Sequence, residues 1–441
     1  MWLLPIVTPF ARAAVRAFHS LEIGGEPIPR EGPLLLVANH PNMGVDGGLL
    51  IAASGRPVRF LAKATLFATP PGKIALEGIG AIRVYRRHDD PGAVSRNEET
   101  FQAARDALVS GAAIAVFPEG ISHSKPSLAP MRTGAARIAL ETARALGRAF
   151  PVVPVGLTYR DKTRFRSKAL AFVAGELAWD DLAGRDDAGA VRELTRRIES
   201  ALRNATVNLE RWEDAPAVLA AESIWAAEKR LPRDPESRFE RQRDIAKILA
   251  RLRERNVPDL MRLEEDVLSF DRFLREIGIG ASTLEMTTRS SVALRWIALR
   301  LPLFAIAAPL LLAGRVLFFV PYRATDLVAS RAKGAEMHAT VKILGGTAIY
   351  ALWILLLAIA AGMRWGAAAG IGAFVLLAFT AGAVLVGTQW WDRALFVARS
   401  FLLLRRRESL RQRLLARRRR LADELEQLRD AYGGDASSSQ A

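Results

Sequence analysis

Short apolar runs alternate with longer amphipathic segments across the first half of the chain. Residues 98–110 and 134–146 show helical spacing, whereas five short runs are typical of buried strands: 33–39, 58–62, 81–85, 112–118 and 151–159. Strands that alternate with helices favour a mainly parallel sheet covered on both faces. The pattern therefore predicts an α/β domain over residues 20–205, with a mixed, mainly parallel sheet covered by helices.

Residues 206–295 have a different pattern. They are charged, amphipathic and nearly free of glycine, which is typical of helices. Pro232, Pro235 and Pro258 should interrupt these helices. We therefore expect a charged helical region after the α/β domain.

The last third of the chain contains long apolar segments. Residues 341–362 carry one charge, at Lys342, and residues 366–388 carry none. Each segment is long enough to cross a hydrocarbon core of roughly 30 Å. The link at residues 363–365 is so short that the two should form a C-terminal transmembrane hairpin.

A third apolar segment, residues 301–321, is weaker because Pro309 and Arg315 interrupt it. A charge near the middle of a bilayer costs at least about 2.5 kcal/mol on insertion scales. We therefore expect a re-entrant or interfacial segment here, within a membrane region that covers residues 296–395.

Charge predicts the orientation of the hairpin. Residues 396–420 contain ten arginines and a single acidic residue, Glu408. Such a segment stays on the cytoplasmic side, so residues 396–441 should form a basic cytoplasmic tail that binds anionic lipids. Because a hairpin returns the chain to the side it left, we expect a multi-pass protein with the α/β domain on the cytoplasmic side.

The N-terminal residues 1–19 fit an amphipathic helix. Arg12 and Arg16 lie four residues apart among apolar neighbours. The helix could lie on a membrane or pack on the α/β domain, and the sequence leaves both alternatives open. Pro5 and Pro9 interrupt the apolar stretch, which argues against a secretory signal.

Overall composition narrows the function classes. A formal net charge of +16 indicates polyanionic partners, but nucleic acid is not expected because no recognition motif accompanies the basic run. The chain has no cysteine, which excludes disulfides, thiolate zinc sites and a cysteine nucleophile. His88 lies beside two aspartates, but no second histidine or cysteine completes a metal site, so no metal is predicted.

The first candidate for chemistry is "VANHPNMGVDGG" at residues 37–48, which contains His40 and Asp46. It follows a predicted strand, where open α/β sheets place their sites. Asp46 could accept a hydrogen bond from one ring nitrogen and leave the other nitrogen free to accept a proton. The pair therefore predicts a general base for a substrate hydroxyl, although a polar turn is the alternative on these residues alone.

Two further stretches place charged groups at predicted strand ends. "FPEGISHSKP" (117–126) has Glu119 before Gly120, and "GIGAIRVYRRHDD" (78–90) ends in Arg86 and Arg87. Arginine suits bidentate binding of phosphate oxygens. By themselves these stretches also fit an ordinary turn and a solvated sheet edge.

Taken together, four blocks resemble the glycerolipid acyltransferase family of glycerol-3-phosphate and 1-acylglycerol-3-phosphate acyltransferases. In order they are His-x5-Asp, Gly-Ile-Gly-Ala-Ile-x-Val-x-Arg, Phe-Pro-Glu-Gly and Val-Pro-Val-Gly, within roughly residues 20–180. The details look closest to the yeast-type glycerol-3-phosphate/dihydroxyacetone-phosphate acyltransferase branch, in which membrane segments follow the catalytic domain.

The resemblance implies an O-acyltransferase of phospholipid biosynthesis. It would transfer an acyl chain from acyl-CoA or acyl carrier protein to glycerol 3-phosphate, without a cofactor. Dihydroxyacetone phosphate and lysophosphatidate are alternative acceptors. A non-catalytic, membrane-anchored lipid-binding protein on the same fold is a further alternative, because a fold does not prove an activity.

The resemblance also implies residue roles. His40 would be the general base, Asp46 would orient it, and Arg86 would bind the acceptor phosphate. Glu119 and Gly120 would shape the acceptor site. Charge and position add Lys63 and Arg132 as weaker phosphate-binding candidates, and Arg87 is a further candidate beside Arg86. Pro154, in the fourth block, would form a wall of the site.

This chain departs from the common family pattern at two places. Five residues, not four, separate His40 from Asp46, and a six-residue step turns about 240° around a helix. A turn or a helix start must therefore bring the two side chains together. After Gly120 the chain has Ile-Ser-His where an arginine is often found, so phosphate binding must depend on Arg86, Arg87 or Arg132.

Overall fold

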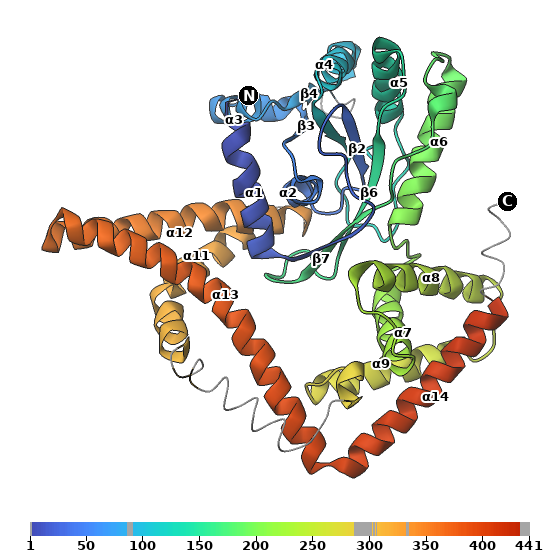
Figure 1. The fold of residues 1–441 in the computed structure, drawn as a ribbon, viewed down its shortest axis with the longest axis vertical. Coiled ribbons are helices and arrows are strands. Elements are labelled where there is room, and N and C mark those ends of the chain that lie inside the picture. Colours follow the sequence, from blue (N-terminus) through green and yellow to red (C-terminus); the bar gives the residue numbers. More distant parts are fainter. Residues whose placement is uncertain are drawn as a thin grey trace. The chain divides into compact units, whose positions relative to one another are not determined.

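The chain folds into two compact units (Figure 1). The computed structural model describes residues 2–85, 91–285, 302, 305, 307–331 and 335–432. The α/β unit comprises Met1–Asn208 and Ala332–Ile343, and the helical unit comprises Leu209–Arg331 and Leu344–Ala441.

A seven-stranded sheet forms the centre of the α/β unit, in the order β1-β7-β6-β2-β5-β3-β4. Strands β2, β3, β4, β5 and β6 run parallel to one another. Strand β7 is antiparallel to β6, and β1 pairs with β7 in the parallel direction. The strands are β1 Ser20–Gly25, β2 Leu34–Ala38, β3 Val58–Lys63, β4 Ile82–Val84, β5 Ala113–Val116, β6 Val152–Tyr159 and β7 Lys168–Val173. The predicted mixed, mainly parallel sheet is confirmed.

The five predicted strands correspond to β2, β3, β4, β5 and β6, while β1 and β7 were not predicted. None of the side chains of β1 is buried, because this strand lies at the edge of the sheet. It therefore lacks the apolar run by which the buried strands are recognised.

Helices cover both faces of the sheet (Figure 1). The helices α4 (Asn97–Val109), α5 (Gly134–Leu146) and α6 (Ala188–Ala205) lie on one face, and α1 (Leu4–Phe18) and α2 (Met43–Ser54) on the other. The side chains of β2 alternate between these layers. Leu35 and Val37 enter the first core, whereas Leu34 and Leu36 enter the second. Alternation along each strand therefore divides the core in two.

A short 3-10 helix, η1 (Ala64–Phe67), and the helix α3 (Pro70–Gly78) connect β3 to β4.

The N-terminal helix α1 packs against α2 through Val15 and Phe18, which are buried. On its opposite side Ile6 and Phe10 are exposed, as is Trp2 just before the helix. One face of the helix therefore packs on the α/β domain, as one of the two alternatives predicts. The other face exposes apolar side chains, which would suit the second alternative, a helix that lies on a membrane.

Four helices of the helical unit pack around a shared core, to which Leu404 of α13 (Ala367–Arg406) also contributes. The four are α7 (Ala215–Glu228), α8 (Pro235–Glu254), α9 (Leu260–Glu276) and α14 (Glu408–Tyr432). The predicted helices of the charged region are present, and Pro232, Pro235 and Pro258 lie between helices or at a helix start.

Residues 396–432, within the segment expected to form a basic cytoplasmic tail, are largely helical. Helix α13 (Ala367–Arg406) extends into this segment, and α14 packs into the helical unit through Leu414 and Leu421. Arg418 is 2% exposed and donates to Glu228 Oε2 at 2.8 Å, to Glu285 Oε1 at 2.6 Å and to the Ala281 carbonyl at 2.9 Å. Part of the arginine run therefore serves packing within the protein. Residues 433–441 lie outside the described residues.

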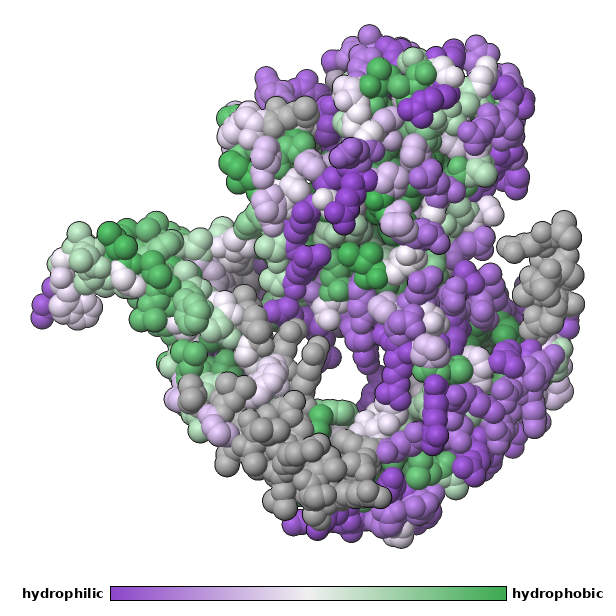
Figure 2. Space-filling model, viewed as in Figure 1, coloured by the Kyte–Doolittle hydropathy of each residue, from purple (hydrophilic) through white to green (hydrophobic). Residues whose placement is uncertain are grey.

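The two long apolar segments expected to form a hairpin are the helices α12 (Ala335–Trp365) and α13. Met337–Trp365 and Ala367–Val384 are long and apolar enough to cross a membrane. The connection is shorter than expected, since Gly366 alone links the helices, with a φ of 92° that favours glycine. Hydrophobic side chains cover the outside of this hairpin (Figure 2), as expected for a surface that contacts lipid.

Residues 307–330 form a bent pair of helices in the helical unit. Ala307–Leu317 and α11 (Phe319–Ser330) meet at 52°, which fits either a broken span or a re-entrant loop. The bend packs against α12, where Trp353 donates to the Leu317 carbonyl at 3.1 Å. The re-entrant segment expected at 301–321 agrees with one of these alternatives. Residues 301, 303, 304 and 306 lie outside the described residues.

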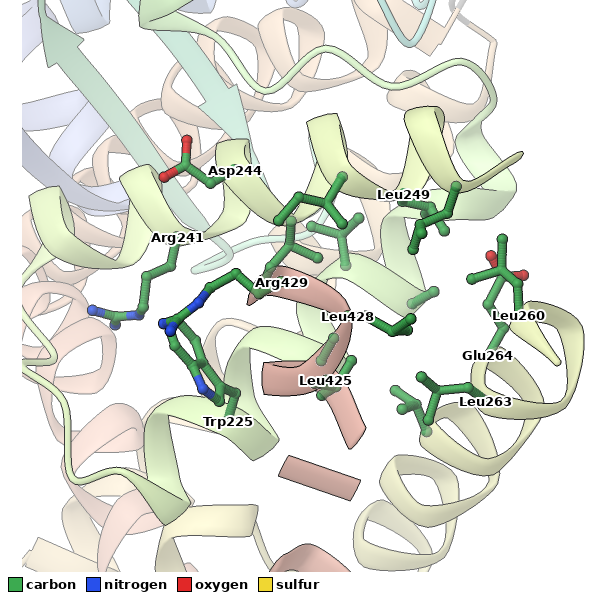
Figure 3. Close-up of a pocket in the computed structure, with 17 residues that line it drawn as sticks. Trp225, Arg241, Asp244, Leu249, Leu260, Leu263, Glu264, Leu425, Leu428 and Arg429 are labelled. Atoms are coloured by element: carbon green, nitrogen blue, oxygen red, sulfur yellow. The ribbon is translucent and has the colours of Figure 1, made fainter. Parts of the chain in front are cut away.

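The helical unit also contains an apolar pocket of about 250 Å³ (Figure 3). Side chains of α7, α8, α9 and α14 line it, with Trp225 and Arg241 at one end and Leu260 at the other. The Arg429 guanidinium lies over the Trp225 ring, 5.1 Å from its centre. None of the candidate catalytic residues lines this pocket, because all of them belong to the α/β unit.

Replacing Arg418 tests the packing of α14. Arg418→Ala would leave Glu228 and Glu285 without their shared partner, and breaking a buried ion pair costs about 3–5 kcal/mol. We therefore expect hydrogen exchange of the α14 and α7 amides in the full-length protein to accelerate strongly. Arg413→Ala is the matched control, because Arg413 is exposed on the same helix and its removal should leave exchange unchanged. Equal exchange in both variants would contradict this packing.

Candidate active site

The candidate residues gather at one edge of the sheet, where the parallel strands end. His40 follows β2 and Glu119 follows β5, while Lys63 and Tyr159 are the last residues of β3 and β6. Parallel strands bring their carboxyl ends to the same edge, which is the usual place for a site in an open α/β sheet.

His40 and Asp46 form a hydrogen-bonded pair. His40 Nδ1 lies 2.8 Å from Asp46 Oδ2, and the Asp46 carboxylate is fully buried. An ionised carboxylate only accepts hydrogen bonds, so the proton of the neutral ring belongs on Nδ1. The other nitrogen, Nε2, is then an acceptor. The hydrogen bond predicted from the sequence is therefore present.

The start of α2 explains how a five-residue gap closes this contact. A turn separates β2 from α2, and Met43 adopts a left-handed φ of 44° at the beginning of the helix. Asp46 lies in the first turn of α2 and accepts the Asn42 backbone N–H at 2.7 Å. The carboxylate therefore points back toward the turn that holds His40, and the helix N-terminus favours its negative charge.

Phe117 covers one face of the His40 ring. The two rings stack with their centres 3.9 Å apart and their planes 10° from parallel. The His40 side chain is 13% exposed, so the imidazole is held in place and one part of it is still accessible to a substrate.

The Glu119 carboxylate is buried and holds the backbone around His40. It accepts the His40 N–H at 3.0 Å and the Ala129 N–H at 2.7 Å, and it also bonds His123 Nε2. Because the Lys125 N–H donates to His123 Nδ1 at 3.1 Å, the ring proton of His123 belongs on Nε2. The hydrogen bonds of the Glu119 carboxylate are thus made to donors within the protein and not to a substrate. Its predicted role in shaping the acceptor site is indirect in this geometry, through the placement of His40.

Gly120 and Arg132 lie side by side next to Glu119. Gly120 has a φ of 72°, and a Cβ atom there would lie 2.6 Å from Arg132 Nε. The Arg132 backbone N–H donates to the Pro118 carbonyl at 2.8 Å, which brings this arginine to the same loop. Arg132 is exposed and forms no ion pair within the described part of the chain, so its charge is available to an anion.

The other predicted residues have different positions. Lys63 ends β3 at the site edge, whereas Pro154 lies within β6, paired with Val37 and buried. The expectation that Pro154 forms a site wall is therefore corrected, because it lies inside the sheet and not at its edge. Arg86 and Arg87, with His88, lie outside the described residues.

Sequence reasoning missed Tyr159, His19 and His123. The Tyr159 hydroxyl donates to Asp46 Oδ1 at 2.6 Å. The edge of the His19 ring meets the Tyr159 ring with 5.3 Å between centres, and His19 Nδ1 lies 3.2 Å from the Ser167 carbonyl. Tyr159 and His19 are distant from the His40 motif in sequence, so no local pattern could have indicated them.

No metal site accompanies this arrangement within the described ranges. These residues include no group of three or more His, Cys, Asp or Glu side chains suited to a metal ion. The chemistry that the site offers is proton transfer at His40, supported by Asp46.

Comparison with known proteins agrees with the resemblance predicted from the four motifs, which is thereby confirmed. Residues 20–158 match the family model described as Acyltransferase. Over 280 residues the chain is 30% identical to glycerol-3-phosphate O-acyltransferase 2 of Saccharomyces cerevisiae, covering 60% of this chain and 36% of the yeast protein. It is 25% identical to an uncharacterized acyltransferase of Schizosaccharomyces pombe over 271 residues, 59% of this chain and 39% of that one.

The chain thus spans less than two fifths of the length of either curated relative. A solved structure, that of the 1-acyl-sn-glycerophosphate (LPA) acyltransferase PlsC from Thermotoga maritima, is 21% identical. The match covers 48% of this chain and 81% of that one, with a TM-score of 0.34.

Acid should destabilise the α/β unit through His19. Burial lowers the pKa of this imidazole, outweighing the opposing effect of its hydrogen bond to Ser167. Below the ordinary histidine value of about 6.5, the unfolded chain therefore binds a proton that the folded chain excludes. The free energy of unfolding should fall with decreasing pH, by up to about 1.4 kcal/mol per unit from this group.

Urea unfolding of the wild type and of His19→Gln at several pH values between 5 and 7.5 checks this linkage. The other histidines are common to both proteins, so the difference between the two slopes isolates His19. We expect a shallower slope for the variant, and identical slopes would contradict the assignment.

Proposed function

We propose that this chain, whose residues 20–158 form an Acyltransferase-family domain, is a membrane-bound O-acyltransferase of phospholipid biosynthesis. It would transfer an acyl chain from acyl-CoA or acyl carrier protein to glycerol 3-phosphate. The observation that carries the proposal is the buried Asp46 carboxylate bonded to His40 Nδ1, which makes Nε2 a proton acceptor at the edge of the sheet. A lipid-binding protein without activity would have no use for such a pair.

In the proposed reaction, His40 Nε2 accepts the proton of the acceptor hydroxyl as its oxygen attacks the thioester carbonyl. Asp46 stabilises the imidazolium that forms. When the tetrahedral intermediate collapses, the carbon–sulfur bond breaks and His40 returns the proton to the departing thiolate. General base catalysis of this kind contributes about 10²–10⁴-fold to a rate.

Positive groups at the sheet edge favour a phosphate-bearing acceptor. Arg132 lies beside Gly120 in the loop that holds Glu119, and Lys63 ends β3. Arg86 and Arg87 follow β4 in sequence and remain candidates on that ground. Both proposed substrates are anionic, so the net charge of +16 favours their approach.

The yeast relative is a glycerol-3-phosphate O-acyltransferase, which favours glycerol 3-phosphate as the acceptor. Lysophosphatidate and dihydroxyacetone phosphate also carry a phosphate, but they differ from glycerol 3-phosphate in the groups next to the reacting hydroxyl. Rates measured with the three acceptors would therefore identify the preferred one. Acyl-CoA and acyl carrier protein are both proposed as donors, because either presents the same thioester.

We further propose that the protein is multi-pass, with the α/β unit on the cytoplasmic side. Two crossings return the chain to its original side, and arginines follow the second span. Arg405, Arg406 and Arg413 are exposed and would contact anionic lipid, whereas the buried Arg418 would not.

Acyl transfer by the purified full-length protein tests the function. With radiolabelled acyl-CoA and glycerol 3-phosphate we expect lysophosphatidate to form, and His40→Ala should reduce kcat at least 100-fold, in line with the loss of a general base of about 10²–10⁴-fold. Parallel reactions with lysophosphatidate and dihydroxyacetone phosphate identify the acceptor by kcat/KM. If His40→Ala keeps full activity, the mechanism is wrong.

Two arginine variants in the same assay separate phosphate binding from chemistry. Arg132→Ala should raise the KM for the acceptor by about 10–100-fold, because a hydrogen bond to a charged group contributes roughly 1.5–3 kcal/mol. Arg137→Ala, at an exposed position in the first turn of α5, is the matched control and should leave KM unchanged.

Single cysteines test the membrane topology, since the natural chain has none. Gln102→Cys in α4 and Gln412→Cys in α14 introduce thiols at exposed positions, and Met363→Cys does so beside the hairpin turn. A membrane-impermeant maleimide should label positions 102 and 412 from the cytoplasmic side and position 363 from the opposite side. Labelling of all three from one side would contradict the hairpin.

A further inference from the structure

The Asp46 carboxylate is held at both of its oxygens. Oδ2 lies 2.8 Å from His40 Nδ1 and accepts the Asn42 N–H at 2.7 Å, while Oδ1 accepts the Tyr159 hydroxyl at 2.6 Å. The terminal torsion of aspartate is broad and roughly two-fold. A donor on each oxygen therefore selects one orientation of the carboxylate.

We propose that Tyr159 is a positioning residue for the reaction, which holds Asp46 in the orientation that serves His40 and disperses part of its negative charge. The inference rests on the proposed function, because it concerns the same His40–Asp46 pair. Tyr159 acts through Asp46 and does not itself touch the reacting atoms.

The fold gives Tyr159 a rigid position. It is the last residue of β6, which pairs with β2 on one side and β7 on the other, and β2 leads directly to His40. The buried His19 ring meets the Tyr159 ring, and the Leu157 N–H and carbonyl bond the Asn39 side chain at 2.7 and 3.0 Å. The end of β6 is thus tied to the turn that carries His40.

The protonation state of the phenol agrees with this role. Burial and the neighbouring Asp46 carboxylate raise the pKa of Tyr159 well above its ordinary value. The phenol therefore stays protonated and donates to Oδ1. Without this donor the negative charge concentrates on Oδ2, and the imidazolium of His40 holds its proton more tightly. His40 would then act as a base only at higher pH.

Tyr159→Phe removes one oxygen atom and keeps the ring. We expect kcat to fall about tenfold, which corresponds to about 1.4 kcal/mol of lost transition-state stabilisation. The KM values for donor and acceptor should stay within about twofold, because no substrate contact is lost. The acidic limb of the pH–rate profile should move to higher pH. A profile that is unchanged or moves to lower pH would overturn the proposal.

Two controls separate positioning from general packing. Tyr432→Phe makes the same change at the end of α14 in the helical unit and should leave kcat and the pH profile unchanged. In an Asp46→Asn background, Tyr159→Phe should cause little further loss, because residues that act through one group are not additive. A full additional tenfold loss in that background would show that Tyr159 acts independently of Asp46, against the proposal.

A readout without catalysis keeps this test independent of the proposed function. Diethyl pyrocarbonate modifies neutral imidazole, and peptide mapping by mass spectrometry reports the rate at His40 alone. In Tyr159→Phe the pH dependence of this rate should move to higher pH, as in the kinetic profile. If no acceptor is acylated by the wild type, the proposed function fails, but the His40 labelling profile still decides the role of Tyr159.

Discussion

The buried Asp46 carboxylate is the interaction on which the candidate site depends. It receives three donors from two segments that are separate in sequence: His40 and Asn42 in the turn between β2 and α2, and Tyr159 at the end of β6. A buried charge is tolerated when hydrogen bonds compensate it. The same bonds that compensate Asp46 also set the tautomer of His40, so the requirement for stability and the requirement for chemistry coincide.

Glu119 is a second buried carboxylate that bonds His40, through the backbone and not the ring. Its donors are the His40 N–H, the Ala129 N–H and the His123 ring. One carboxylate thus orients the imidazole and the other holds the backbone that carries it. Glu119 is directed into the protein and carries the wrong charge for an anion, so the proposed phosphate recognition would depend on cations such as Arg132.

Arginine serves two purposes in the helical unit. Arg418 is buried between Glu228 and Glu285 and joins α14 to α7, although its sequence neighbours suggest a solvent-facing basic run. Arg413 on the same helix is exposed. A helix turns about 100° per residue, so adjacent arginines face different surroundings. Charge counting alone could therefore predict a membrane-facing tail but not which arginines are free to meet lipid.

Local sequence patterns determined much of this protein. Apolar runs located β2 to β6, long apolar segments located the hairpin, and the order of four motifs indicated the family and the His40–Asp46 pair. These features depend on residues that are close together in the sequence, so hydrophobic periodicity and motif spacing are enough to predict them. Only the tertiary structure placed Tyr159 on Asp46, Glu119 under His40, and Pro154 inside the sheet. Each of these depends on which strands lie side by side, and pairing between distant segments leaves no trace in local periodicity.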